Sequence, residues 1–218
     1  MVGESIFAFF GREVEGVYQN QAEIDADPVA VANNLVPGDF KYKENGGDPT
    51  TIDDDDRVGL GSYLPTYSFG FNVGVTYDNF DLSLNGFGQG GNKILNRKRM
   101  EVIFTSDTNW DRDFAINRWH GEGTTNSYPS AAAVRKSWNQ KLNDYYVEDG
   151  GYFRIQNITL GYTIKTKKGF PETRIYCTAE KPLTIFSYNG FNPEVSNGVD
   201  NQTYPVPATY IFGLNIKI

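Results

Sequence analysis

The stretch Asp149–Ile164 constrains the fold more than any other part of the chain, because its second half alternates strictly between two kinds of side chain. Successive side chains of a β-strand point to opposite faces, so this alternation separates an apolar set from a small or polar set. The apolar set is Ile158, Leu160, Tyr162 and Ile164, and the other set is Asn157, Thr159, Gly161 and Thr163. Such a strand suits a membrane barrel, which has lipid outside and a wet lumen inside.

The same period of two predicts further antiparallel strands. Asp78-Asn79 supplies turn residues between two strictly alternating arms, which predicts a hairpin. We expect about six strands in all: Ser5–Tyr18, Thr66–Tyr77, Phe80–Gln89, Tyr152–Ile164, Thr173–Phe186 and Thr209–Ile218. The predicted fold class is therefore all-β, as an antiparallel transmembrane β-barrel segment.

The lengths of the connections alternate as well. Gln19–Pro65, Gly90–Asp149 and Ser187–Pro207 are long, whereas Asp78-Asn79 and Lys165–Pro171 are short. Bacterial barrels place short turns in the periplasm and long loops outside the cell, so we expect the three long connections to be external. A short helix near residues 21–26 is the one regular element that we expect within these loops.

Composition excludes several functions. The net charge is −7 and the pI is about 4.8, which does not suit nucleic-acid binding, because that requires a basic patch. Cys177 is the single cysteine, so no intrachain disulfide is possible, and it behaves as a small apolar residue inside a strand. His120 is the single histidine, and no serine lies in a nucleophile motif, so we do not expect an enzyme.

Residues 148–164, EDGGYFRIQNITLGYTI, resemble the "edgsYlRlknitLgYtlp" signature of the SusC/RagA family of TonB-dependent outer-membrane importers in Bacteroidetes. Four more stretches match that family in its own order: residues 11–26, 36–91, 174–196 and 204–218. The resemblance covers nearly the whole chain. It implies that residues 1–218 of this chain form the C-terminal part of a TonB-dependent receptor β-barrel. The plug domain and the earlier barrel strands of such a receptor are absent from this sequence.

The resemblance also implies an activity and partners. It implies active uptake of oligosaccharides or peptides across the bacterial outer membrane, with a SusD-like surface lipoprotein as the lid. Energy would come from the TonB complex acting on the plug, so we expect the segment alone not to transport. Outer-membrane lipid is the implied partner of the apolar face, and no cofactor is implied.

The acidic stretch Glu44–Asp56 resembles an Asp- and Gly-rich loop of the same family, which is itself similar to a calcium loop with oxygen ligands at alternate positions. Pro49 stands where a glycine would make the sharp turn, and an additional threonine before Ile52 alters the later spacing. We therefore expect an acidic, solvated loop, with a weak Ca²⁺ site as the alternative. The candidate ligands are Glu44, Asp48, Asp53, Asp55 and Asp56.

The three tryptophans all lie in the second long connection, Gly90–Asp149. Aromatic faces stack on sugar rings and peptide side chains, so Trp110, Trp119 and Trp138 are candidates for contact with substrate or with a partner. The alternative is that they pin the long loop to itself. Pro129-Ser130 stands where the family usually carries Pro-Arg, and Asn192-Pro193-Glu194 resembles a family loop that we expect to shape the third connection.

The last strand is a candidate for recognition during barrel assembly. Its apolar side chains are Tyr210, Phe212, Leu214, Ile216 and Ile218. We expect the outer strands Ser5–Tyr18 and Thr209–Ile218 to be the two edges of the sheet. Because an open edge carries unpaired backbone groups, we expect the chain alone to aggregate or to be degraded.

A secreted β-sandwich that binds carbohydrate is the alternative fold and function. In a sandwich, a second sheet would bury the face formed by Tyr67, Phe69, Phe71 and Val73. In a barrel, that face meets lipid.

Overall fold

The computed structural model describes residues 3, 5–102, 109–131, 137–165 and 171–217. The chain divides into two compact units, and we describe each by itself. The loop unit comprises Met1–Tyr63, Lys93–Glu148 and Ser196–Gln202, and the sheet unit comprises Leu64–Asn92, Asp149–Val195 and Thr203–Ile218.

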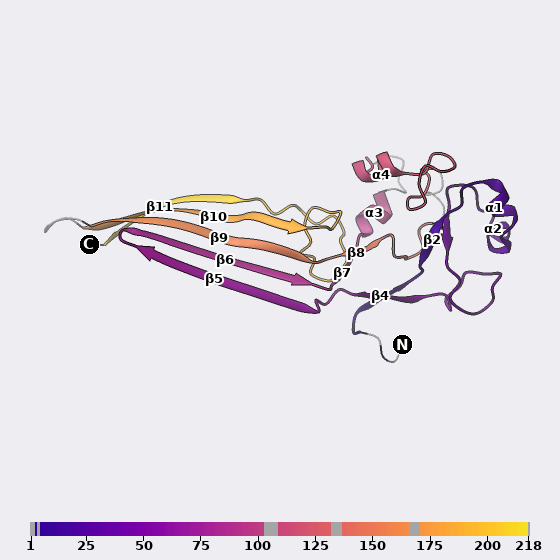
Figure 1. Ribbon diagram of the computed structural model, residues 1–218, viewed down its shortest axis with the longest axis horizontal. Helices are drawn as coiled ribbons and strands as arrows, with labels where there is room; N and C mark the ends of the chain where they lie inside the picture. Colours follow the sequence, from indigo (N-terminus) through magenta and orange to yellow (C-terminus); the bar gives the residue numbers. More distant parts are fainter. Residues whose placement is uncertain (1–2, 4, 103–108, 132–136, 166–170, 218) are drawn as a thin grey trace. The chain divides into compact units, whose positions relative to one another are not determined.

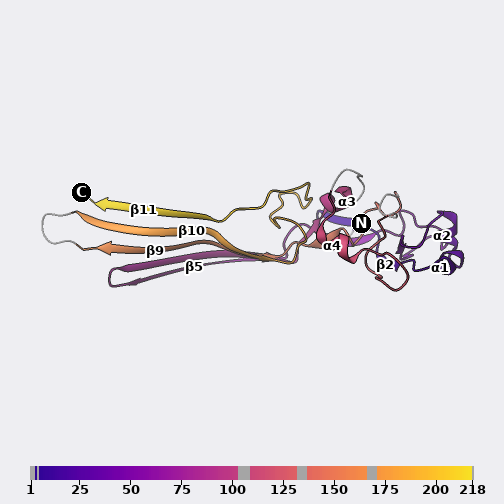
Figure 2. The same cartoon turned by 90° about the horizontal axis from the view of Figure 1, so that it is seen from above.

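The sheet unit is a single antiparallel sheet of five long strands. They are β5 (Tyr67–Tyr77), β6 (Phe80–Gly90), β9 (Tyr152–Ile164), β10 (Glu172–Phe186) and β11 (Thr209–Lys217). Both ribbon views show them side by side (Figures 1 and 2), in the order β11-β10-β9-β6-β5. The predicted hairpin is confirmed, because β5 and β6 pair without interruption from Tyr67 and Gly90 to Tyr77 and Phe80.

The strand register confirms that one face of this sheet is apolar. Directly opposite residues of paired strands point to the same side. One transverse row runs through Val75, Leu82, Leu160, Cys177 and Phe212. The register places the other predicted residues on this side too: Tyr67, Phe69, Phe71, Val73, Tyr162 and Leu214.

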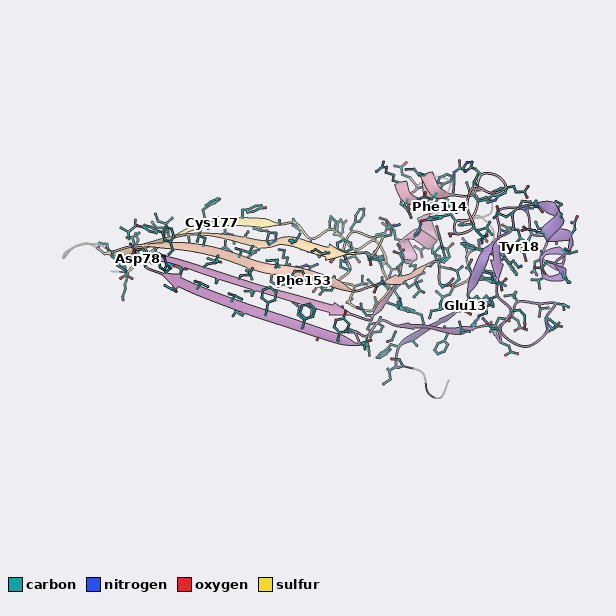
Figure 3. All side chains as sticks on the ribbon, in the orientation of Figure 1. Glu13, Tyr18, Asp78, Phe114, Phe153 and Cys177 are labelled. Atoms are coloured by element: carbon teal, nitrogen blue, oxygen red, sulfur yellow. The ribbon has the colours of Figure 1, made fainter. Side chains whose placement is uncertain are left out.

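Within the described residues, no second sheet covers the apolar face. Tyr77 and Phe212 are each 81% exposed, and Leu160 is 51% exposed. A sandwich would bury these side chains, so the exposure speaks against the β-sandwich alternative. Figure 3 shows side chains projecting from the strands of this sheet, with Phe153 and Cys177 labelled.

The prediction of a sixth sheet strand, Ser5–Tyr18, is wrong. This segment forms two short strands, β1 (Ala8–Gly11) and β2 (Val14–Val17). β1 pairs with β4 (Val58–Ser62), and β2 pairs with β3 (Phe40–Tyr42), in separate two-stranded sheets. The break falls at Arg12, whose backbone exchanges hydrogen bonds with Leu142 and Asp144, so the ladder cannot continue. One edge of the five-stranded sheet is therefore β5.

The two longest connections are more regular than expected. Between β2 and β5 lie α1 (Gln21–Asp25), α2 (Pro28–Ala32), β3 and β4, so the predicted helix near residues 21–26 is confirmed. Between β6 and β9 lie β7 (Lys93–Leu95), α3 (Arg97–Val102), α4 (Arg112–Asn117) and β8 (Val147–Asp149). Side-chain caps start the helices, as when Asn20 accepts a hydrogen bond from the Glu23 amide.

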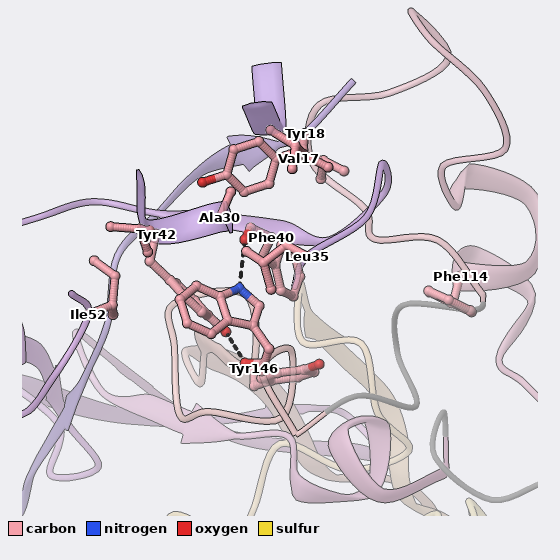
Figure 4. Packing of buried hydrophobic residues seen from close by; sticks show 12 residues of the cluster. Val17, Tyr18, Ala30, Leu35, Phe40, Tyr42, Ile52, Phe114 and Tyr146 are labelled. Atoms are coloured by element: carbon pink, nitrogen blue, oxygen red, sulfur yellow. Dashed lines mark hydrogen bonds between the residues drawn. The ribbon is translucent and has the colours of Figure 1, made fainter. Parts of the chain in front are cut away.

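These connections share one aromatic core, shown in Figure 4. Its buried residues are Val17, Tyr18, Ile24, Val29, Ala30, Leu35, Phe40, Tyr42, Ile52, Phe114, Trp138 and Tyr146. The polar atoms of the core are paired: the Tyr42 hydroxyl donates to the Trp138 carbonyl over 2.8 Å, and the Trp138 indole donates to the Phe40 carbonyl over 2.8 Å. Burial raises the pKa of Tyr42, which keeps the hydroxyl a donor. No helix among the described residues is long and apolar enough to cross a membrane.

Candidate functional site

The apolar face of the sheet unit has the dimensions of a membrane-crossing surface. The eleven residues of β5 extend for roughly 33 Å at about 3.3 Å per step. Tilted by about 45°, a strand of this length covers roughly 23 Å, close to the apolar band of about 25 Å in outer-membrane barrels. Rings lie toward each end of the strands, with Phe80 and Tyr162 4.8 Å apart and Phe69 stacked 6.2 Å from Phe153.

Glycines in β6 make room for the rings of β5. A Cβ atom on Gly86 would lie 2.5 Å from the Phe71 ring, and one on Gly88 would lie 2.5 Å from the Phe69 ring. Each ring therefore lies flat across the neighbouring strand, where it covers backbone that a glycine leaves bare.

The opposite face of the sheet carries mainly small and polar side chains, together with Phe87 and Ile211, and several of the polar groups pair across strands. The Thr159 and Thr178 hydroxyls are 2.8 Å apart, and the Asn157 amide donates to Asn85 over 3.4 Å. Arg174 donates to both carboxylate oxygens of Asp81, with the Nε to Oδ1 distance at 2.9 Å. This face is therefore suited to contact water.

Arg154 holds the connection that follows β10, a role that sequence reasoning missed. It is 1% exposed, and its guanidinium donates to Glu194 over 2.6 Å, to Asn192 over 3.1 Å and to Thr184 over 3.0 Å. Asn192 also accepts from the Glu194 amide, so the turn predicted for this stretch is present. The available signal was an arginine in an otherwise apolar and aromatic strand start, YFRI.

Three carboxylates of the acidic loop Glu44–Asp56, those of Asp48, Asp53 and Asp56, accept hydrogen bonds from the loop's own backbone amides. Asp56 is fully buried and accepts from the amides of Asn45 over 2.9 Å and Asp53 over 2.7 Å. Hydrogen bonds from the Thr50 hydroxyl and amide hold the pKa of Asp48 below its usual value. Asp53 accepts from the Asp55 amide over 2.8 Å, and Glu44 is exposed.

Three cations contact this loop, and one of them is Arg57, which directly follows it and pairs with Asp54. The Arg12 guanidinium donates to the Asp53 carbonyl over 2.7 Å and lies 3.6 Å from Asp54, and Lys141 donates to the Ile52 carbonyl over 3.3 Å. Desolvation and the charge of Arg12 lower the pKa of Lys141. In the described part of the chain, no three His, Cys, Asp or Glu side chains are grouped to hold a metal ion. The five candidate Ca²⁺ ligands do not form such a group, and weak or absent Ca²⁺ binding stays a prediction.

The three tryptophans have different environments. Trp138 is 6% exposed and belongs to the core of the loop unit, so its surroundings fit the alternative in which tryptophan pins the loop. Trp119 is half-buried and donates to Gln19 over 3.3 Å. Trp110 is half-buried against the edge of the Phe114 ring, with Arg118 6.0 Å from its centroid. Substrate or partner contact stays a prediction for Trp110 and Trp119.

The remaining sequence candidates occupy ordinary positions. His120 is exposed, with its ring nitrogen 3.1 Å from the Arg118 carbonyl. Ser130 is buried, and its amide donates to Gly38 over 2.9 Å. In β11, Tyr210, Phe212, Leu214 and Ile216 lie on the apolar face, as expected, while Ile218 lies outside the described residues.

Sequence reasoning also missed an open pocket of about 560 Å³ in the loop unit. Its lining includes Glu15, Gln19, Glu23, Asp27 and Lys41. Gln19 organises one wall, because its side-chain amide donates to the Val17 and Thr125 carbonyls and accepts from the Gly123 amide. This wall joins segments that are about 100 residues apart, which local patterns do not reveal.

Comparisons with known proteins agree with this geometry. Over 99% of its length the chain is 31% identical to TonB-dependent receptor P26 and 30% identical to TonB-dependent receptor P3, both of Formosa agariphila. Over 35% of its length it is 35% identical to TonB-dependent receptor SusC of Bacteroides thetaiotaomicron. The chain spans 23%, 22% and 8% of the lengths of these three relatives. No family model matches the chain.

Solved structures share the fold. The RagAB peptide importer in its "open-open" state matches with a TM-score of 0.72 at 17% identity, over 97% of this chain and 22% of that chain. Its "closed-closed" state matches with a TM-score of 0.68 at 19% identity, over 96% of this chain and 23% of that chain. The solved structures show the fold, and the relatives at 30% identity or more show the family. The chain therefore belongs to the SusC-type TonB-dependent receptors, which are proteins of the bacterial outer membrane.

Proposed function

We propose that this chain contributes membrane-crossing strands to the β-barrel of an outer-membrane importer. The observation that carries the proposal is the two-faced sheet, with large apolar side chains exposed on one side and mainly small or polar groups on the other. Lipid provides the only solvent in which such an exposed apolar face is favourable, and a water-filled lumen suits the polar face.

The outer edges of the sheet pair with further strands of the receptor in this proposal. Among the described residues, β5 pairs only with β6, and β11 pairs only with β10. Unpaired backbone groups are costly in lipid, so both edges need neighbours. The plug domain and the other barrel strands belong to the rest of the receptor, and loss of Phe212–Ile218 should abolish assembly by removing one of these edges.

The transported substrate is an oligosaccharide or a peptide, and the partners are a SusD-like lipoprotein and the TonB complex. Support comes from the name of the SusC relative and from the RagAB structures, which are described as a peptide importer. The long connections face outward, where substrate and lipoprotein arrive, and the Asp78-Asn79 turn faces the periplasm.

Cysteine labelling of the whole receptor tests the membrane-crossing sheet. With Cys177 replaced by alanine, single cysteines at Phe71 and Leu160 should resist a water-soluble maleimide, and cysteines at the neighbouring Asn72 and Thr159 should react. The neighbours are matched controls, because they differ from the test positions only in the face they occupy. Equal reaction on both faces would refute a lipid-facing sheet.

A second experiment tests the transport activity. Deletion of the receptor should abolish energy-dependent uptake of labelled peptide or oligosaccharide, and unchanged uptake would contradict the proposal.

A further inference from the structure

The Arg174–Asp81 ion pair joins two strands that are not neighbours. Asp81 lies on β6 and Arg174 on β10, and β9 runs between them. The guanidinium donates through Nε and Nη2 to both carboxylate oxygens, a bidentate geometry that fixes the orientation of both groups. The guanidinium also lies 5.0 Å from the centroid of the Tyr176 ring.

Gly161 is the residue of β9 that permits this bridge. A Cβ atom there would lie 2.4 Å from Arg174 Nη2 and 2.4 Å from Asp81 Oδ1. The ion pair therefore passes directly over the Gly161 backbone. Because the colliding atoms are the ends of flexible side chains, alanine at this position would displace the ion pair and leave the strand in place.

The register between β6 and β9 needs a determinant that the apolar pattern does not supply. Slipping the pairing by one residue would move every apolar side chain to the polar face, which the pattern forbids. Slipping it by two residues keeps both faces intact. No tight turn fixes the pairing either, since residues 91–151 separate the two strands in the chain.

A slip of two residues would break the bridge. In one direction, the slip sets Asp81 opposite Thr159 and moves it about 6.6 Å farther from Arg174 along the strand. In the other direction, it sets Asp81 opposite Thr163, in the row of Arg174, and the Thr163 side chain then lies where Gly161 had left room for the bridge. We infer that Arg174, Asp81 and Gly161 form a register lock, in which an ion pair that arches over a glycine selects one strand pairing among those that the apolar face allows. The three are positioning residues for barrel assembly, so the inference rests on the proposed function.

Disulfide trapping in the whole receptor reads the register directly. In a Cys177→Ala background, the pair Ser83→Cys and Thr159→Cys reports the native register, because these residues are directly opposite. The pairs Ser83→Cys with Asn157→Cys, and Asn85→Cys with Thr159→Cys, report slips of two residues in the two directions. All four positions lie on the polar face, where an aqueous oxidant reaches them.

We expect only the native pair to cross-link in the otherwise unchanged receptor. Arg174→Met should raise the ratio of slipped to native cross-links by about two- to fivefold, and Gly161→Ala should do the same. In a receptor that already carries Arg174→Met, Gly161→Ala should cause no further rise in the ratio of slipped to native cross-links. Lys165→Met is the matched control, because it removes an exposed ion pair with Asp78 that does not cross an intervening strand.

Three outcomes would overturn the inference. One is an unchanged cross-link ratio in Arg174→Met, and another is an additive effect of Gly161→Ala in that variant. If Arg174→Met fails to assemble, the exchanged pair Asp81→Arg with Arg174→Asp decides: recovery of the native cross-link supports the lock, and equal failure overturns it. Absence of the native cross-link from the unchanged receptor would instead refute the strand pairing and with it the proposed function.

Discussion

Replacing Glu194 by alanine should destabilise the receptor more than replacing Arg154 by methionine. The two partners differ in exposure, since the side chain of Arg154 is 2% exposed and that of Glu194 is 55% exposed. Without Glu194, the guanidinium stays buried with only the neutral oxygens of Asn192 and Thr184 as acceptors. In Arg154→Met, the exposed carboxylate of Glu194 can be solvated by water, and the methionine side chain fills much of the volume that the arginine occupied.

The magnitudes follow from this asymmetry. A hydrogen bond to a charged group contributes about 1.5–3 kcal/mol, and a buried charge that loses its partner costs more than the bond itself. We expect Glu194→Ala to lower the free energy of unfolding by about 2–4 kcal/mol and Arg154→Met by about 1–2 kcal/mol. The double variant should cost about 1–2 kcal/mol less than the sum, because the unpaired charge exists in only one single variant.

Urea unfolding of the receptor in lipid vesicles, followed by tryptophan fluorescence, measures these differences. Limited proteolysis of the connection between β10 and β11 provides a second readout, and cleavage should increase most in Glu194→Ala. Glu172→Ala, at the exposed start of β10, is the control and should leave both measurements unchanged. Equal costs for the two variants, with no coupling between them, would refute the reasoning.

Three further predictions concern other parts of the chain. Leu160→Lys should cost the assembled barrel about 2–4 kcal/mol if it lies near the membrane midplane, whereas Thr159→Lys on the polar face should cost far less, as urea titration of the two receptors would show. Trp138→Ala should lower the free energy of unfolding by about 3–5 kcal/mol, because it empties a buried site, but Trp119→Ala should change substrate uptake more than stability if Trp119 contacts substrate. Calorimetry should show no micromolar Ca²⁺ binding to the receptor, and Pro49→Gly combined with deletion of Thr50 should raise the affinity if the Gly turn is what the loop lacks.

The strands of the sheet could be predicted from the sequence because their environment changes at every residue. A sheet with lipid on one side and water on the other, as we propose for this one, requires side chains that alternate with a period of two, and β5, β6, β9, β10 and β11 all display this alternation. The loop unit could not be predicted in this way. Its core pairs Tyr42 with Trp138, and Phe40 with Asn139, across nearly 100 residues, and no local period encodes such contacts.

The error at Ser5–Tyr18 has a related cause. Phenylalanines and valines in this segment suggested one long strand, but Arg12 interrupts it with a buried charge that binds the acidic loop. Arg154 was overlooked because a charged residue in a strand is usually expected to face solvent. Here its carboxylate partner, Glu194, lies in a connection 40 residues farther along the chain. In both cases a buried arginine carries long-range information that appears locally as ordinary polarity.

Several glycines in these strands, on both faces of the sheet, lie beneath a large side chain of the neighbouring strand. A strand glycine usually weakens a sheet, since it packs nothing. On the apolar face, Phe71 lies over Gly86, and on the polar face the Tyr176 ring lies over Gly213, where a Cβ atom would be 2.1 Å from it. In each such pair, the ring packs over two strands, and this packing offsets the small loss of sheet stability at the glycine. Substitution of Gly86 or Gly213 should therefore be harmful only while the ring across from it is present, whereas Gly74, which lies opposite Ser83 with open space around it, should accept a Cβ atom.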